Sequence, residues 1–140
     1  MGTNYFHRTM ATQKLILEPF RNALRSLDEA LAMVPVEDII RDGTIQRFEY
    51  TYELAWKMLR RHFEWRGDTG IEGKQRKEIY REAARSGLVA DPVKWFNYNE
   101  ARNSTSHDYS KSKAEKTYEL VREFAVDARF LLEQLEYHHA

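Results

Sequence analysis

The sequence predicts an all-α fold, an antiparallel up-and-down helical bundle of four to five helices. Charged residues make up 31% of the chain, glycine and proline number only 6 and 3, and the mean hydropathy is −0.72. Apolar residues recur every three or four positions, which is the spacing of one helix face. A chain of 140 residues has the size of one domain, so we assign residues 13–140 to a single helical bundle domain.

The first dozen residues precede this periodic pattern. We expect residues 1–12 to form an unstructured lead-in, with Met10 as a candidate natural start. They lack the apolar run of about seven to fifteen residues that a signal peptide requires, so we expect a cytoplasmic protein. The sequence contains no cysteine, which excludes disulfides and cysteine-bound metals and agrees with a reducing compartment.

The first two helices are predicted from their apolar stripes and from the residues that flank them. Pro19 suits the first turn of a helix, and Pro35 ends that helix because proline lacks a backbone donor. Asp38 is expected to cap a second, longer helix that stops at Gly67. The buried stripes are Phe20, Leu24, Leu27 and Leu31 on the first helix, and Ile45, Phe48, Tyr52, Ala55, Leu59 and Phe63 on the second.

Three shorter patterns complete the bundle after a glycine-rich loop at residues 66–73. A short helix is expected over residues 74–86, and the pair Asp91–Pro92 is typical of the start of another. Ser112 and Glu115 have capping-box spacing and are expected to open the last helix. The expected inward residues are Ile79, Tyr80 and Ala83; Trp95, Phe96 and Tyr98; and Tyr118, Val121, Phe124, Ala125, Ala128, Leu131, Leu132 and Leu135.

A polar run at residues 101–109 follows the aromatic helix and holds the candidate catalytic residues Arg102, Asn103 and His107. Asn103 and His107 are four residues apart and share one helix face, with Arg102 at its edge. A metal-independent ribonuclease needs an imidazole that moves a proton and a guanidinium that stabilises phosphate charge. The alternative is an ordinary polar helix end, whose Asn, Ser and Thr side chains bond frayed backbone groups.

The second helix offers polar neighbours for that site. Gln46 and Glu53 are candidate substrate-binding residues, because both lie beside the apolar stripe and could orient groups near Arg102. For Glu49 and Lys57 we favour a plain exposed charged strip, in which Lys57 pairs with Glu53 one turn away.

The chain has no overall charge, with 22 Lys and Arg against 22 Asp and Glu, and it shows no strong basic stripe. No whole-molecule field therefore draws it to nucleic acid or to a membrane surface, and such binding has to be local. Besides Arg102, the local candidates are Arg60, Arg61 and His62. His62 either contacts phosphate with these arginines or is an ordinary structural histidine.

Several chemistries are excluded by their missing motifs. The sequence has no phosphate loop, no Gly-x-Gly-x-x-Gly and no Gly-x-Ser-x-Gly. A di-iron bundle needs two Glu-x-x-His motifs, and one occurs here, at Glu136 and His139. Neither a metal nor a cofactor is therefore expected. Trp56 and Trp95 are interpreted as core or interface anchors rather than as platforms for stacked bases.

Four separated stretches resemble the nucleotidyltransferase substrate-binding protein family of the HEPN superfamily. They are Arg41 to Lys57, the phrase IYREAARSGLV at residues 79–89, Trp95, and ARNSTSHDY at residues 101–109, and the resemblance spans about residues 15–137. It implies an antiparallel helical bundle, usually a homodimer, that partners a small separate nucleotidyltransferase and helps to bind its nucleotide or acceptor substrate.

The resemblance also supplies an alternative function. In HEPN ribonuclease toxins the motif is Arg, a polar residue, three variable residues and His, which Arg102, Asn103 and His107 match position by position. Tyr109 matches a tyrosine to which, in a subset of these toxins, the partner nucleotidyltransferase adds AMP to silence the toxin. The chain is therefore expected to be a nucleotide-binding subunit or a metal-independent endoribonuclease; a purely structural bundle is disfavoured because it needs no such motif.

The aromatic content of 13% is generous for a core of this size. We therefore expect aromatic surface on the helices that bear Trp56 and Trp95 to contribute to a homodimer interface, since aromatic side chains often anchor interfaces.

Overall fold

A computed structural model describes residues 14–104 and 110–140. Its helices are α2 (Glu18–Leu31), α3 (Asp38–Arg66), α4 (Arg76–Arg85), α5 (Pro92–Ser104) and α6 (Lys111–His138), with a short 3₁₀ turn, η1 (Ile71–Gly73), between α3 and α4. Within these two ranges there is no strand, so the predicted all-α class is confirmed. The predicted lead-in at residues 1–12 lies outside the described residues.

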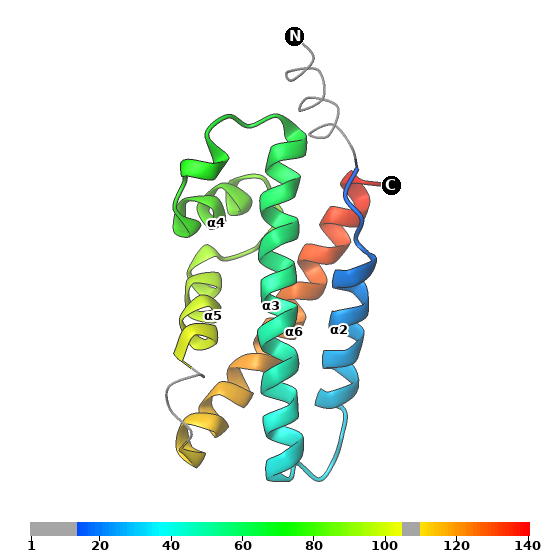
Figure 1. The fold of residues 1–140 in the computed structure, drawn as a ribbon, viewed down its shortest axis with the longest axis vertical. Helices are drawn as coiled ribbons and strands as arrows, with labels where there is room; N and C mark the ends of the chain where they lie inside the picture. The colour runs from blue at the N-terminus through cyan, green and yellow to red at the C-terminus, as the bar shows by residue number, and fades with distance from the viewer. Residues whose placement is uncertain (1–13, 105–109) are drawn as a thin grey trace.

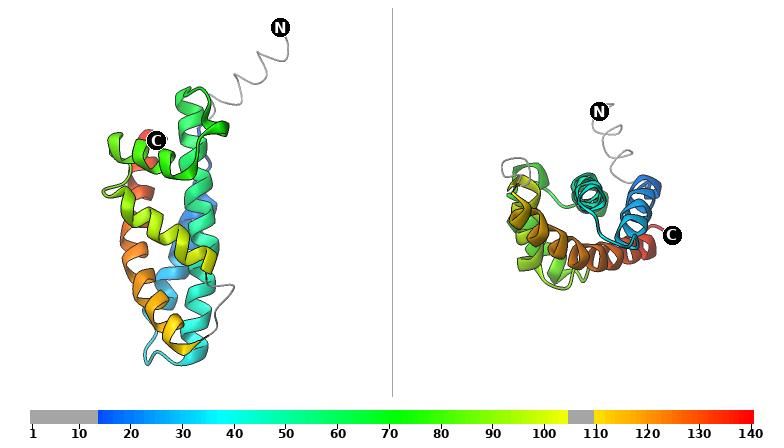
Figure 2. Two further views of the ribbon diagram at one scale, coloured as in Figure 1. Left: turned by 90° about the vertical axis from the view of Figure 1, so that its left-hand side faces the viewer. Right: turned by 90° about the horizontal axis from the view of Figure 1, so that it is seen from below.

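The long helix α3 is the centre of the bundle, and α2, α5 and α6 pack against it (Figure 1). The chain descends through α2, rises through α3, descends through α5 and rises through α6, while the short α4 lies across one end beside α5 (Figures 1 and 2). Sequential long helices are therefore antiparallel, as the short connections predicted.

Most predicted boundaries agree with the structure to within one or two residues. Helix α2 buries Phe20, Leu24 and Leu27 completely, and α3 ends at Gly67, whose φ of 95° is a left-handed conformation that favours glycine. Along α3 the buried face includes Arg41 and Thr44, whereas Ile45 is only partly buried. Thr44 can enter the core because its hydroxyl donates to the Ile40 carbonyl at 2.7 Å.

The predicted helix caps need two corrections. Asp38 is the first residue of α3 rather than its cap; the cap position belongs to Glu37, and Asp38 forms an ion pair of 2.8 Å with Arg41. The cap of α6 is Ser110, not Ser112, because the Ser110 hydroxyl accepts the Lys113 backbone N–H at 3.2 Å. Capping-box spacing alone could not place the helix start to better than two residues.

Aromatic rings from three helices fill the middle of the core. The ring of Phe124 meets those of Phe48 and Tyr98 edge to face, with centroids 5.1 and 5.3 Å apart. Trp95 is 1% exposed and Trp56 is 9% exposed, so both tryptophans lie within the core of one chain. This confirms their interpretation as core anchors, whereas the expected dimer interface on aromatic surface of α3 and α5 stays a prediction.

Candidate functional site

Arg102 lies in the last turn of α5, where it faces two carboxylates of α3. Its guanidinium is 3.8 Å from the Glu49 carboxylate and 3.8 Å from that of Glu53. Glu49 and Glu53 are one helical turn apart, so they present their charges on the same side of α3. Each of these three side chains is about one third exposed, which leaves the group partly in contact with solvent.

A second arginine joins this group from α4. The Arg76 guanidinium is 3.9 Å from the same Glu53 oxygen that faces Arg102, and it donates a hydrogen bond of 3.0 Å to the Asn99 side-chain oxygen. It also lies over the Trp56 ring, 4.3 Å from the ring centroid. We call Glu49, Glu53, Arg76, Asn99 and Arg102 the Arg102 cluster; it brings together side chains from α3, α4 and α5.

Two buried tyrosines are connected to the Arg102 cluster by hydrogen bonds through Asn99. The Tyr52 hydroxyl donates to the Asn99 side-chain oxygen at 2.8 Å and is hydrogen-bonded to the Tyr80 hydroxyl. Burial raises the pKa of Tyr52, and it raises the pKa of Tyr80 far above its ordinary value. Both phenols are thus neutral, and they fix the Asn99 amide that Arg76 binds.

The structure brings some of the sequence-predicted site residues together. Glu53 lies beside Arg102, while Gln46 is an exposed residue about one turn before Glu49 on α3. Asn103 is exposed and adjoins Arg102 at the end of α5. His107 and Tyr109 lie outside the described residues. The catalytic and regulatory roles of Arg102, Asn103, His107 and Tyr109 therefore stay predictions.

Three members of the Arg102 cluster were missed by sequence reasoning. Glu49 was assigned to an exposed charged strip, and neither Arg76 nor Asn99 was singled out. One signal was present: Glu49 and Glu53 are like charges four residues apart, an arrangement that destabilises a helix unless cations compensate for it. The sequence could not say which cations these were, because they come from α4 and α5.

His62 lies elsewhere, nine residues beyond Glu53 on α3, or about 13 Å at the rise of an α-helix. It is 2% exposed, and its Nδ1 is 3.0 Å from Nε2 of His139, the residue that follows α6. The rings of His62 and His138 are 5.1 Å apart. Burial, reinforced by His139 and His138, lowers the pKa of His62 to about 4. This histidine cluster of His62, His138 and His139 joins the end of the chain to α3.

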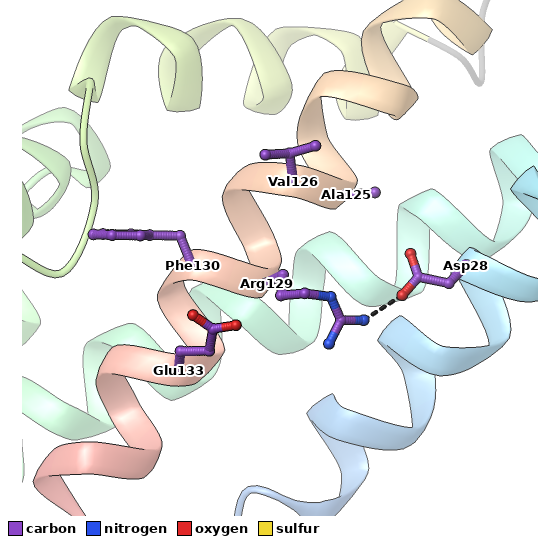
Figure 3. A pocket seen from close by; sticks show the side chains of 6 residues that line it. All are labelled: Asp28, Ala125, Val126, Arg129, Phe130 and Glu133. Carbon is purple, nitrogen blue, oxygen red and sulfur yellow. Dashed lines mark hydrogen bonds and ion pairs between the residues drawn. The ribbon is translucent and has the colours of Figure 1, made fainter.

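A surface hollow lies away from the Arg102 cluster. It is formed between α2 and α6, where Asp28 of α2 forms an ion pair with Arg129 of α6 (Figure 3). The remaining lining residues are Ala125, Val126, Phe130 and Glu133. The hollow contains no member of the Arg102 cluster, so we treat it as a separate surface feature.

Two further observations concern the residues that the structure describes. None of their helices is both long and apolar enough to pass through a membrane. No three of their histidine, aspartate or glutamate side chains are grouped so that they could hold a metal ion.

Comparison with known proteins supplies the family. Residues 15–137 match the family described as nucleotidyltransferase substrate binding protein like. The chain belongs to this family. A Haemophilus influenzae family relative named probable ribonuclease HepT is 37% identical to it over 141 residues, covering 90% of this chain and 95% of the relative.

Two solved structures share the fold of this family member. One is a Haemophilus influenzae protein described as revealing the fold of a substrate binding domain of a nucleotidyltransferase; it has a TM-score of 0.78 at 36% identity and covers 86% of this chain and 99% of its own. The other is from Thermus thermophilus, with a TM-score of 0.73 at 28% identity, covering 83% of this chain and 98% of its own.

Proposed function

We propose that this chain is the substrate-binding subunit of a separate, minimal nucleotidyltransferase and that the Arg102 cluster is its binding site. The observation that carries the proposal is the placement of Arg102: a partly exposed guanidinium held between two carboxylates at the end of α5. Guanidinium groups bind phosphate through paired, charge-assisted hydrogen bonds. A nucleotide or a phosphate-bearing acceptor is therefore the ligand that this site fits best.

The other members of the Arg102 cluster position this guanidinium. Glu53 is shared by Arg76 and Arg102, and Arg76 is held in turn by Asn99 and by the Trp56 ring. A ligand phosphate thus meets cations whose positions are already restricted, which reduces the conformational entropy that binding costs. Gln46 and Asn103 stay candidate contacts of the same ligand, whereas His62 belongs to the histidine cluster and is not part of the proposed site.

The partner is tested by purifying the tagged chain from its native host and identifying what accompanies it. We expect a small nucleotidyltransferase to co-purify, and the isolated pair to bind ATP more tightly than the nucleotidyltransferase alone. An Arg102→Ala variant should retain the partner and lose the gain in ATP affinity. Purification of the chain without any nucleotidyltransferase would contradict the proposal.

A second function is favoured by a specific comparison: the 37% identical relative is named probable ribonuclease HepT. In this alternative the chain is a metal-independent endoribonuclease. His107 removes the proton from a ribose 2′-hydroxyl, whose oxygen attacks the neighbouring phosphorus. Arg102 stabilises the added negative charge. The 5′-oxygen of the next nucleotide then leaves, taking a proton from the protonated His107, and a 2′,3′-cyclic phosphate remains.

This alternative has a direct test. The purified chain should cleave single-stranded RNA in the presence of EDTA, and His107→Ala should abolish cleavage while His138→Ala leaves it unchanged. Incubation with the nucleotidyltransferase and ATP should add AMP to Tyr109, which mass spectrometry detects, and the modified chain should be inactive. A wild-type chain that cleaves no RNA in any form, or a Tyr109 that stays unmodified, would count against the toxin function.

We infer that the chain forms a homodimer through α6 rather than through the tryptophan-bearing helices. Val126, Phe130 and Tyr137 are 71, 39 and 80% exposed, and their spacing of four and seven residues places them on one stripe of α6. Sedimentation should give a dimer for the wild type and a monomer for Phe130→Glu. A Phe130→Glu chain that still sediments as a dimer would exclude this face.

A further inference from the structure

Helix α4 carries a basic segment that the neutral total charge conceals. Residues 74–85 contain five basic and two acidic side chains, a local net charge of +3. Two of these cations, Arg76 and Arg85, form ion pairs with Glu53 and Glu82, so the excess of positive charge is local and modest. The segment includes Lys77 and Arg81, which are one turn apart and both exposed.

Lys77 and Arg81 share one aromatic ring as a common partner. The Lys77 ammonium is 5.4 Å and the Arg81 guanidinium 5.3 Å from the centroid of the same ring, that of Phe96 on α5. No ion pair with a carboxylate is formed by either residue within residues 14–104 and 110–140. The ring restricts both side chains and leaves their two positive charges uncompensated. We call Lys77 and Arg81 the α4 cation pair.

The α4 cation pair adjoins the Arg102 cluster, which has no charge of its own. Two arginines and two glutamates sum to zero there, so that cluster exerts little attraction at a distance. Arg76 of the cluster directly precedes Lys77 on α4. Phe96 and Asn103 are seven residues apart, so they lie on the same face of α5, separated by about 10 Å along its axis. The nearby positive field thus comes from Lys77 and Arg81.

We propose that the α4 cation pair binds the phosphate backbone of a single-stranded RNA whose reacting phosphate lies at Arg102. The inference rests on the ribonuclease function proposed above and adds where the rest of the strand is bound. A strand that leaves Arg102 along the Asn103 face of α5 reaches the two cations beside Phe96. Grooves that track single strands combine positive charge with aromatic rings in this way.

The test measures the affinity for a fluorescein-labelled oligouridylate by anisotropy at several salt concentrations. The double variant Lys77→Ala, Arg81→Ala should bind about ten times more weakly at low salt, and its salt-dependence slope should fall by about 1.4, because each lost phosphate contact to a single strand removes about 0.7. Phe96→Leu keeps both charges and removes the aromatic face, so it should weaken binding by a smaller factor. The matched control is Arg25→Ala, Arg61→Ala, which removes two exposed cations from α2 and α3.

The outcomes separate this inference from the functions on which it builds. Affinity and slope that are unchanged in the α4 double variant, or a wild type that binds no RNA, would overturn it. A double variant that keeps its RNA affinity but no longer co-purifies with the nucleotidyltransferase would identify the surface as a protein-docking site and also overturn it. A wild type that binds RNA through Lys77 and Arg81 without cleaving it would support this surface and contradict the ribonuclease function.

Discussion

The two polar clusters on α3 differ in how they treat charge: one pairs cations with carboxylates, whereas the other buries the imidazole of His62. In the Arg102 cluster each guanidinium faces a carboxylate, and the side chains keep about one third of their surface exposed. Among the described residues of the histidine cluster and its surroundings, no carboxylate hydrogen-bonds to His62, which is almost fully buried and has a pKa lowered to about 4. Burial without a counter-charge removes the proton.

This difference in charge and exposure indicates which of the two clusters can bind a ligand. Charged groups that are restrained but partly exposed can exchange one ionic partner for another, so the Arg102 cluster suits an anionic substrate. A neutral imidazole whose nitrogen is bonded to a second imidazole has little to offer a phosphate. We therefore assign the histidine cluster to holding α6 against α3, and the variants below test that division.

The largest effect is expected from Arg102 under the proposed ribonuclease function. Arg102→Ala should lower the rate of RNA cleavage by about 1,000-fold, since loss of one preorganised group that stabilises transition-state charge costs about that much. Thermal unfolding should change little, because the side chain is partly exposed. Single-turnover cleavage and a melting curve measure the two quantities. Equal cleavage rates for wild type and variant would remove Arg102 from the mechanism.

The next-largest effect is expected on the stability of the fold in acid, and it comes from the histidine cluster. His62 titrates near 6.5 when unfolded and near 4 when folded, so between these pH values the unfolded chain binds more protons. The free energy of unfolding should therefore fall as the pH drops from about 6.5 to about 4, by up to about 3 kcal/mol, and this group should add nothing further below that range. Urea unfolding at several pH values measures the slope.

A substitution isolates the contribution of His62. His62→Gln should flatten the acid dependence, whereas His138→Gln, at an exposed histidine, should leave most of it in place. If the wild type is equally stable at pH 6.5 and pH 4.5, the assignment of a buried neutral imidazole is incorrect.

A smaller effect is expected from the carboxylates that position Arg102. The double variant Glu49→Gln, Glu53→Gln should lower kcat by about tenfold, because the guanidinium loses its anchors. Its KM for RNA should also fall, because two negative charges near the phosphate are gone. Glu29→Gln, Glu133→Gln removes two exposed charges elsewhere and serves as the control. A purely structural role would not produce opposite changes in turnover and affinity.

The smallest effect tests the tyrosines beneath the Arg102 cluster. Tyr52→Phe leaves the buried Tyr80 hydroxyl without its partner and should lower the free energy of unfolding by about 1 to 2 kcal/mol. Tyr50→Phe removes a hydroxyl that bonds Ser26 at the surface and should cost less than about 0.5 kcal/mol. Chemical denaturation measures both losses. If the two variants lose the same free energy of unfolding, burial of the Tyr52–Tyr80 hydrogen bond does not add to stability.

The fold was largely predictable because its determinants are local. The spacing of Phe20, Leu24 and Leu27 defines one helix face, and Gly67 ends α3 with a backbone conformation that glycine favours. The error at the start of α6 occurred because two residues satisfy the same local rule: Ser110 and Ser112 are both good caps, and only the packed chain determines which one is used.

The candidate site was predictable only in part, because its contacts join helices that are distant in the sequence. Spacing along α3 placed Glu53 near the site, but the approach of Arg76 depends on how α4 crosses the end of the bundle. The burial of His62 agrees with the interpretation of it as a structural histidine, but its partner could not be predicted for the same reason, since His139 is 77 residues away. Motif spacing gives candidate residues, whereas their ionisation depends on tertiary packing.

The sharing of one Glu53 oxygen by arginines of α4 and α5 also bears on the order of events during synthesis. The residues that meet there are 23 and 49 positions from Glu53, and the core beneath them closes only when Phe124 of α6 packs on Phe48. Contacts of such separation form late, after the loops between them have been closed. A nascent chain on the ribosome therefore lacks the assembled cluster until α4 and α5 have emerged and packed against α3.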